Sequence, residues 1–168
     1  MVSALAWSAD GTRLASGSWG HGSDHLLIWD TQSWTQIRTL DDPTELVNGV
    51  AWSADGERLV SAGSDGILRW WNPDNGQCIL SRPGHEGPIQ SLRASPDGHR
   101  LASCGDDGAI RIWEMETGDP VTTLRRDRPY ERLDITGIKG LTDAQTLALK
   151  LMGAVEDLSD AEWNKHEL

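Results

Sequence analysis

The chain has 168 residues, of which 38% are hydrophobic and 24% are charged, and this composition is typical of a globular domain rather than of a disordered chain. Its formal net charge of −11 argues against a nucleic-acid backbone or an anionic membrane as partner, because both require a positively charged surface. No run of residues approaches the roughly 18 apolar residues that a membrane-spanning helix needs.

An internal repeat dominates the sequence. The chain holds nine tryptophans and no phenylalanine, and Trp29, Trp71 and Trp113 stand 42 residues apart. Around them the same turn and strand segments recur three times. A period of this length indicates a structural repeat, whose single unit cannot bury its own apolar faces and must stack on its neighbours.

The first unit, residues 1–42, begins with a strand and continues with Ser8-Ala-Asp-Gly11, which predicts a turn. Compared with the other units it has a few extra residues between its second and third strands, within Trp19–Ser23. The second unit, residues 43–84, repeats the pattern from Val47 onward.

The third unit, residues 85–125, shows the pattern most clearly. It predicts strands at Ile89–Ala94, Arg100–Cys104, Ala109–Glu114 and Pro120–Leu124. The connections between them are rich in Pro, Asp and Gly, which favour tight turns.

Both faces of these strands carry apolar or small residues. On the first strands Leu5, Val50 and Leu92 correspond, and on the opposite face lie Ala4, Gly49 and Ser91. A sheet that is apolar on both faces must be covered on both sides, and a radial stack of sheets achieves this. We therefore predict an all-β fold of three four-stranded antiparallel blades that form part of a β-propeller.

The units resemble those of WD-repeat β-propellers. The similarity rests on the segment ending in Ile28-Trp29-Asp30, on its two copies, and on Gly84-His85 before the third unit. The resemblance implies a buried hydrogen-bonded tetrad of His, Ser, Asp and Trp in each blade. Its members would be His85, Ser103, Asp107 and Trp113 in the third unit, Ser61, Asp65 and Trp71 in the second, where Pro43 replaces the His, and Ser16 and Trp29 in the first.

The resemblance also implies a peptide-docking surface on the narrow face, formed by the loops nearest the tetrads. By position this surface would contain Trp19, His21, Leu46, Asn48, Ser64, Pro88, Gln90 and Asp106. Trp19 either projects from its Gly-rich loop as a binding hot spot or folds over the blade, and the sequence leaves both alternatives open.

The number of units falls short of a closed ring. Propellers have four to eight blades, and three blades leave two apolar sheet faces uncovered. We expect that the chain is the C-terminal piece of a longer protein. The alternative is self-association that completes a ring.

Beyond Arg125 the period stops, and residues 126–168 form a C-terminal extension. Thr142 and Gln145 make a capping box, and apolar residues at helical spacing then predict a helix at 142–152. The segments 128–137 and 140–145 resemble the C-terminal extension of bacterial NB-ARC (STAND-type) proteins that end in WD repeats. This resemblance implies a bacterial signalling protein whose nucleotide-binding module lies outside these residues.

The two cysteines, Cys78 and Cys104, form no CxxC motif and indicate no disulfide framework. Asp10 and Arg13 interrupt the only early apolar stretch, so the sequence predicts no secretory signal. We therefore expect a cytoplasmic location.

A metal site at His21, Asp24 and His25 would suit zinc, but these residues lie in a Gly-rich insertion rather than on one helical face. We predict no catalytic, cofactor-binding or metal-binding residues. The favoured function is a non-catalytic protein-interaction scaffold or sensor that binds a protein or peptide. The alternatives are a self-assembling propeller unit and, last, a metal-dependent hydrolase.

Overall fold

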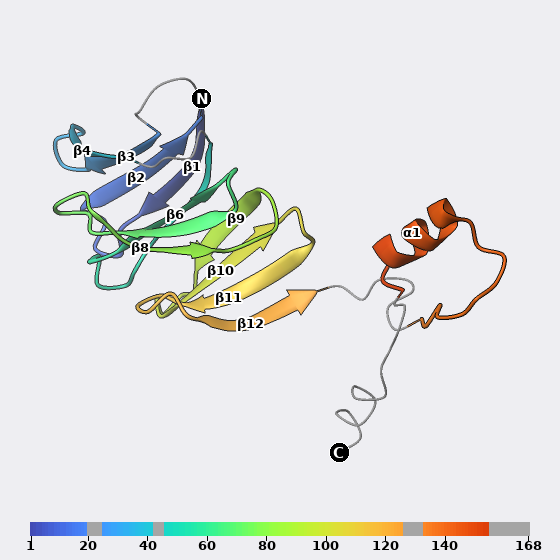
Figure 1. Cartoon of the computed structure of the whole chain (residues 1–168). Helices are drawn as coiled ribbons and strands as arrows, with labels where there is room; N and C mark the ends of the chain where they lie inside the picture. The colour runs from blue at the N-terminus through green and yellow to red at the C-terminus, as the bar shows by residue number, and fades with distance from the viewer. Residues whose placement is uncertain (20–24, 42–45, 126–132, 155–168) are drawn as a thin grey trace, which may run out of the picture. The chain divides into compact units, whose positions relative to one another are not determined.

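The structure is a computed structural model that describes residues 1–19, 25–41, 46–125 and 133–154. The chain divides into two compact units, Met1–Arg125 and Arg126–Leu168, and we describe each by itself. In the first unit the described residues form three four-stranded antiparallel sheets, which follow one another in chain order (Figure 1). This confirms the predicted all-β class and the three four-stranded blades.

The four strands of each blade follow one another in sequence, and each pairs with the next. Blade 1 contains β1 (Val2–Trp7), β2 (Arg13–Ser18), β3 (Leu26–Asp30) and β4 (Gln36–Leu40). Blade 2 contains β5 (Val47–Trp52), β6 (Leu59–Gly63), β7 (Ile67–Trp71) and β8 (Cys78–Pro83). Blade 3 contains β9 (Ile89–Ala94), β10 (Arg100–Gly105), β11 (Ala109–Glu114) and β12 (Pro120–Arg125). The blades meet along their first strands, because β5 packs against β1 and β9 packs against β5.

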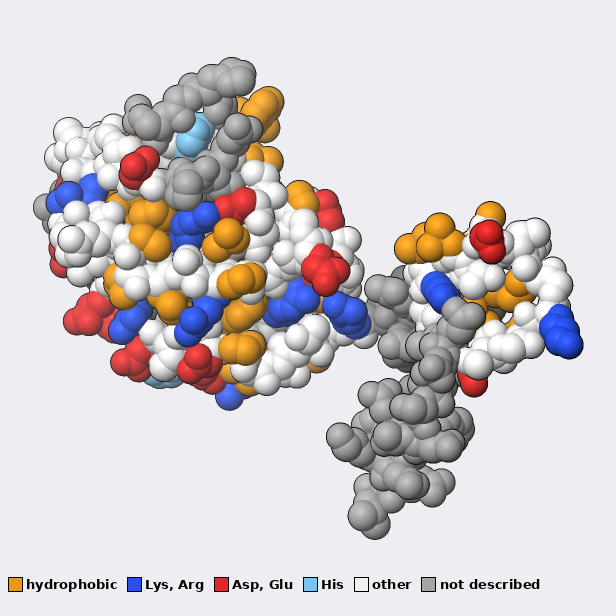
Figure 2. All heavy atoms as spheres, viewed as in Figure 1, with side chains coloured by type: hydrophobic (Ala, Val, Ile, Leu, Met, Phe, Trp, Pro, Cys, Tyr) orange, Lys and Arg blue, Asp and Glu red, His pale blue; other side chains and the backbone are white. Residues whose placement is uncertain are grey.

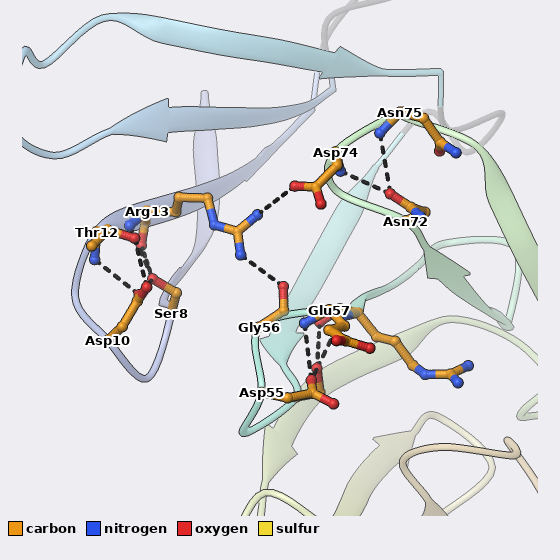
Figure 3. Close-up of polar contacts among 12 residues, drawn as sticks. Ser8, Asp10, Thr12, Arg13, Asp55, Gly56, Glu57, Asn72, Asp74 and Asn75 are labelled. Atoms are coloured by element: carbon orange, nitrogen blue, oxygen red, sulfur yellow. Dashed lines mark hydrogen bonds and ion pairs between the residues drawn. The ribbon is translucent and has the colours of Figure 1, made fainter.

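A serine–aspartate pair shapes the turn between the first and second strands of each blade. The Ser8 hydroxyl donates to Asp10 Oδ1 at 2.6 Å, and the Thr12 N–H donates to the same oxygen at 3.0 Å (Figure 3). These hydrogen bonds, that from Ser8 first, lower the pKa of Asp10 to about 2. Gly11 follows with a φ of +72°, which glycine adopts without strain. Equivalent bonds occur at Ser53–Asp55 and Ser95–Asp97.

Two apolar clusters fill the seams where neighbouring blades meet. The seam between blades 1 and 2 contains Ala15, Leu26, Ile28 and Leu40 from blade 1 and Val47, Val50, Trp52, Leu59 and Trp71 from blade 2. The seam between blades 2 and 3 contains Ala51, Val60, Ala62, Leu68 and Trp70 from blade 2 and Ile89, Leu92, Leu101, Trp113 and Met115 from blade 3. Blade 2 is therefore covered on both faces, as its sequence predicts.

Gly49 shows how closely two blades approach. A Cβ atom at this position of β5 would lie 2.6 Å from the Leu92 Cβ on β9. Because neither strand can move without disturbing its sheet, only glycine fits at this point of the seam.

Arg13 ties blade 1 to blade 2 from the outside of the seam (Figure 3). Its guanidinium donates to the Gly56 carbonyl at 2.8 Å and to the Asp74 carboxylate at 3.1 Å. The same group lies 4.8 Å from the ring centre of Trp52, within reach of a cation–π interaction.

The second unit contains the helix α1 (Asp143–Leu151), with Thr142 as its N-cap. The Thr142 hydroxyl accepts from the Gln145 N–H, and the Gln145 side chain accepts from the Thr142 N–H, so the expected capping box is present. None of its residues is buried, and Leu147 and Leu151 are 59% and 70% exposed. No helix in the described ranges has the length and apolar composition needed to cross a membrane.

Candidate functional site

Blade 3 brings four side chains from separate elements into one buried network. His85, before β9, places Nδ1 2.8 Å from Asp107 Oδ1 in the β10–β11 turn. Its Nε2 lies 2.8 Å from the hydroxyl of Ser103 on β10, and the Trp113 indole N–H on β11 donates to that hydroxyl at 2.9 Å. A carboxylate only accepts hydrogen bonds, so Nδ1 carries the proton that His85 donates to Asp107. The network thereby fixes the approach to β9 against the β10–β11 hairpin.

Arg111 extends this network and was not anticipated from the sequence. Its guanidinium donates to Asp107 Oδ2 at 2.7 Å and to the Gly84 carbonyl at 2.6 Å. Blade 2 contains the equivalent pair, in which Arg69 lies 2.6 Å from Asp65. The signal was present in the sequence, because an Arg follows the hairpin Asp by four residues in both units.

The surroundings of Asp107 favour its ionised form. Burial alone would raise its pKa, but hydrogen bonds from His85, from Arg111 and from the N–H groups of Ala109 and Glu86 outweigh that effect. The pKa of Asp107 therefore lies well below its ordinary value. The buried, ionised carboxylate therefore accepts the hydrogen bonds that hold the surrounding donors in place.

The other two blades retain only part of the network. The Trp29 indole N–H donates to the Ser16 hydroxyl at 2.8 Å, and the Trp71 N–H donates to the Ser61 hydroxyl at 2.9 Å. Asp65 holds Arg69. Pro43 of the second unit lies outside the described residues. Among the described residues the His–Asp pair is therefore a feature of blade 3.

Three residues expected on the narrow face lie around the junction of blades 1 and 2. Trp19 pairs through its backbone with Leu46, and the Ser64 N–H donates to the Leu46 carbonyl at 3.0 Å. The Trp19 N–H also donates to the Met1 carbonyl at 3.0 Å. Its side chain is 50% exposed, which favours the projecting alternative over the folded one. His21 lies outside the described residues.

The expected residues of blade 3 form a second group. The Gln90 amide donates to the Asp106 carboxylate at 2.9 Å, and the Asp106 N–H donates to the Pro88 carbonyl at 3.0 Å. Asn48 differs from the expectation of an open binding residue, because its amide donates across the seam to the Ile89 carbonyl at 2.8 Å. Asn48 therefore fastens blade 2 to blade 3. The sequence could not show this, because the contact depends on how the blades pack.

The described residues contain no group of three His, Cys, Asp or Glu side chains placed to hold a metal ion. His25 is 8% exposed, while His21 and Asp24 lie outside the described residues. Ser103 is 1% exposed and its hydroxyl serves Trp113 and His85, so it cannot meet a substrate as a nucleophile would.

The comparison with protein families agrees with this geometry. The model of the WD domain, G-beta repeat (WD40), matches residues 1–30, 34–72 and 76–114. The chain belongs to the WD40 family. The second and third matches each combine the last strand of one blade with three strands of the next, so the WD40 repeats link neighbouring blades covalently.

Two curated relatives are similar to part of this WD40 chain. Human transducin beta-like protein 3 is 32% identical over 102 residues, which cover 54% of this chain and 12% of that protein. The periodic tryptophan protein 2 homolog of Dictyostelium discoideum is 33% identical over 70 residues, which cover 42% of this chain and 8% of that protein. The chain thus corresponds to a small part of the length of these relatives.

Two solved structures share the fold. The structure of U3-55K gives a TM-score of 0.65 at 20% identity, covering 74% of this chain and 39% of that one. The crystal structure of the RRP9 WD40 repeats gives a TM-score of 0.66 at 20% identity, covering 75% of this chain and 39% of that one. The chain is a partial WD40 propeller and, by its family, a non-catalytic protein-interaction scaffold.

Proposed function

We propose that the chain docks a peptide segment of a partner protein on its narrow face, with Trp19 as the main anchor. The observation that carries this proposal is the combination of an indole that is 50% exposed with a backbone fixed by Met1 and Leu46. A large aromatic side chain on a fixed backbone loses little conformational entropy on binding, which is typical of hot spots.

The charge of the chain supports one class of peptide. The net charge is −11, and Asp106 and Glu86 are exposed in blade 3. Acidic surfaces attract basic partners and repel acidic ones. We therefore propose a peptide that combines an apolar residue for Trp19 with basic residues.

Selection from a phage-displayed library of random peptides provides the probe. Titration calorimetry of a selected peptide should show affinity for Trp19→Ala weakened by roughly 30-fold, which corresponds to the about 2 kcal/mol of a hot spot. Trp34→Ala is the matched control, because Trp34 is 63% exposed in another turn of blade 1. Equal affinities for the native chain and Trp19→Ala would exclude the proposed surface.

We also propose that the chain is part of a cytoplasmic bacterial signalling protein with an NB-ARC-type module. The resemblance of residues 128–145 to the C-terminal extension of such proteins supports this proposal. The curated relatives reported above are eukaryotic, from human and Dictyostelium, and lend this proposal no support. Mass spectrometry of the polypeptide recovered from fractionated native cells tests it. Peptides of such a module in a cytoplasmic protein support the proposal, and their absence from that polypeptide contradicts it.

A further inference from the structure

Blade 2 contains a pocket at the end of its sheet opposite the loops that lie nearest the tetrads. The pocket has a volume of about 260 Å³ and is formed by two turns and the outer strand. Glu57 and Arg58 line it from the β5–β6 turn, Asn72 and Asp74 from the β7–β8 turn, and Ile79 from β8. Figure 3 shows the two turns, with Glu57 on one and with Asn72 and Asp74 on the other. The pocket therefore belongs entirely to the central blade.

Arg58 occupies a position that carries an arginine in every blade. Arg13, Arg58 and Arg100 each follow the glycine of the first turn by two residues. The residue opposite this arginine directly follows the repeat tryptophan. It is Asp30 opposite Arg13 and Glu114 opposite Arg100 in the strand ladders. In blade 2 the corresponding residue is Asn72, so a neutral amide replaces the carboxylate.

This replacement leaves Arg58 without the kind of partner that the other two arginines have. Arg100 Nε lies 3.9 Å from Glu114 Oε1, and the Arg13 guanidinium donates to Asp74 at 3.1 Å. Arg58 is partly buried, yet its guanidinium forms no hydrogen bond or ion pair with any residue that the structure describes. A guanidinium has five N–H donors, so it can hold a carboxylate through two parallel hydrogen bonds.

Asn72 adds donors to the same pocket. Its Oδ1 accepts from the N–H groups of Asp74 at 2.9 Å and Asn75 at 3.1 Å (Figure 3). These two bonds fix which end of the amide is the oxygen. The Nδ2 group has no acceptor within the described ranges, and it can therefore donate to a ligand beside Arg58.

Most carboxylates near the pocket already have partners. On the face of the first unit seen in Figure 2, basic side chains lie close to acidic ones. Asp74 holds Arg13, and Asp55 accepts hydrogen bonds from its own turn. Glu57 is exposed, and its carboxylate makes no ion pair in the part of the chain that the structure describes. One unpaired carboxylate thus lies beside one unpaired guanidinium.

We propose that this pocket binds an Asp or Glu side chain of a partner protein's peptide segment, in which a basic residue adjoins the acid. The carboxylate of the peptide accepts from Arg58 and Asn72 and supplies the charge that Glu114 supplies in blade 3. The basic residue pairs with Glu57, which offsets the repulsion between the acidic rim and the acid of the peptide. Ile79, 50% exposed, packs against the aliphatic parts of these side chains.

This site is separate from the peptide-docking surface on the narrow face. The narrow face is built from the loops before the first strands and between the second and third strands. The pocket is built from the turns at the opposite ends of the same strands. The two sites can therefore be tested independently.

The test is an NMR titration of the ¹⁵N-labelled full chain with the capped dipeptide acetyl-Glu-Lys-amide. Addition of the dipeptide should shift the signals of Arg58 Nε–H and of the Asn72 side-chain amide until they saturate. Acetyl-Gln-Lys-amide, which lacks the carboxylate, should bind at least about 10-fold more weakly, because its hydrogen bonds are not charge-assisted. Acetyl-Glu-Gln-amide, which lacks the ammonium, should bind about 3-fold more weakly, as expected for an exposed ion pair.

Two substitutions in the pocket test the two donors. Arg58→Met should weaken binding of acetyl-Glu-Lys-amide by at least about 10-fold. Asn72→Asp should have a similar effect, because it restores the acidic residue of the other blades and neutralises Arg58 within the chain. The fold should tolerate Asn72→Asp, since Asp30 accepts the same two turn N–H bonds in blade 1. Arg100→Met, at the same position of blade 3, is the matched control and should bind as the native chain does.

Three outcomes overturn the proposal. They are equal affinities for the Glu and Gln dipeptides, native affinity in Arg58→Met or Asn72→Asp, and tighter binding of inorganic phosphate than of acetyl-Glu-Lys-amide at the same signals. The Trp19→Ala variant should bind the dipeptide as the native chain does. Loss of the library-selected peptide with intact dipeptide binding would bear on the narrow face alone.

Discussion

The buried His85 imidazole joins three parts of blade 3, and its removal should cost more than one hydrogen bond. His85→Ala removes one hydrogen-bond partner from each of Asp107 and Ser103 and opens a cavity, so we expect a loss of about 2–4 kcal/mol in the free energy of unfolding. Urea denaturation measures this loss. His99→Ala, at an exposed site of the same blade, should change it by less than about 0.5 kcal/mol. Equal midpoints for His85→Ala and His99→Ala would contradict the structural role of the network.

The lowered pKa of Asp107 makes stability depend on pH in a defined direction. The unfolded chain binds a proton at this carboxyl near its ordinary pKa of 3.8, while the folded chain resists protonation. The stabilisation by Asp107 is therefore complete above about pH 4 and is lost as the pH falls toward the folded pKa. Between about pH 7 and about pH 3, urea midpoints should fall less steeply for Asp107→Asn than for the native chain. Equal slopes would show that Asp107 is not a source of the acid sensitivity.

Among single residues, the sequence predicted those whose roles recur in each unit of the repeat. It missed those whose roles depend on how neighbouring blades pack. His85, Ser103, Asp107 and Trp113 followed from the family pattern, and the structure places them within hydrogen-bonding distance of one another. The cross-seam bond of Asn48 could not be predicted, because no local pattern fixes the neighbouring blade.

Among the elements, the connection between blades 1 and 2 depends on Arg13. Its ion pair with Asp74 contributes little, because that carboxylate is 86% exposed. The bond to the Gly56 carbonyl and the contact with Trp52 are better shielded, so Arg13→Met should lower the free energy of unfolding by about 1–2 kcal/mol.

Arg58→Met is the matched control for Arg13→Met in urea denaturation. Arg58 holds the same position in blade 2, but its guanidinium forms no hydrogen bond to the described residues. Losses of equal size in the two variants would contradict the proposed role of Arg13.

The ends of the elements were predictable where a local interaction sets them. The expected strands Ile89–Ala94 and Ala109–Glu114 have the same bounds in the structure, because turns rich in Asp and Gly delimit them. The helix expected at 142–152 spans Asp143–Leu151, since its cap residues lie outside the helix proper. The sequence could not predict whether its apolar side is buried, because burial requires a partner surface, and no residue of the helix is buried.

At the scale of the whole molecule, the first unit consists of three blades joined by two apolar seams. The sequence predicted that the sheets are apolar on both faces, because the alternation of apolar and small residues is the same in all three units. It could not show which residues meet across a seam, since those contacts depend on how the blades pack.

The most direct test of this account is titration calorimetry of a phage-selected peptide against the native chain and the Trp19→Ala variant. We predict that the affinity of the variant is weaker by roughly 30-fold, because Trp19 is the exposed aromatic anchor of the proposed docking surface. Equal affinities for the two chains would contradict the account, because they would show that the Trp19 indole does not hold the peptide.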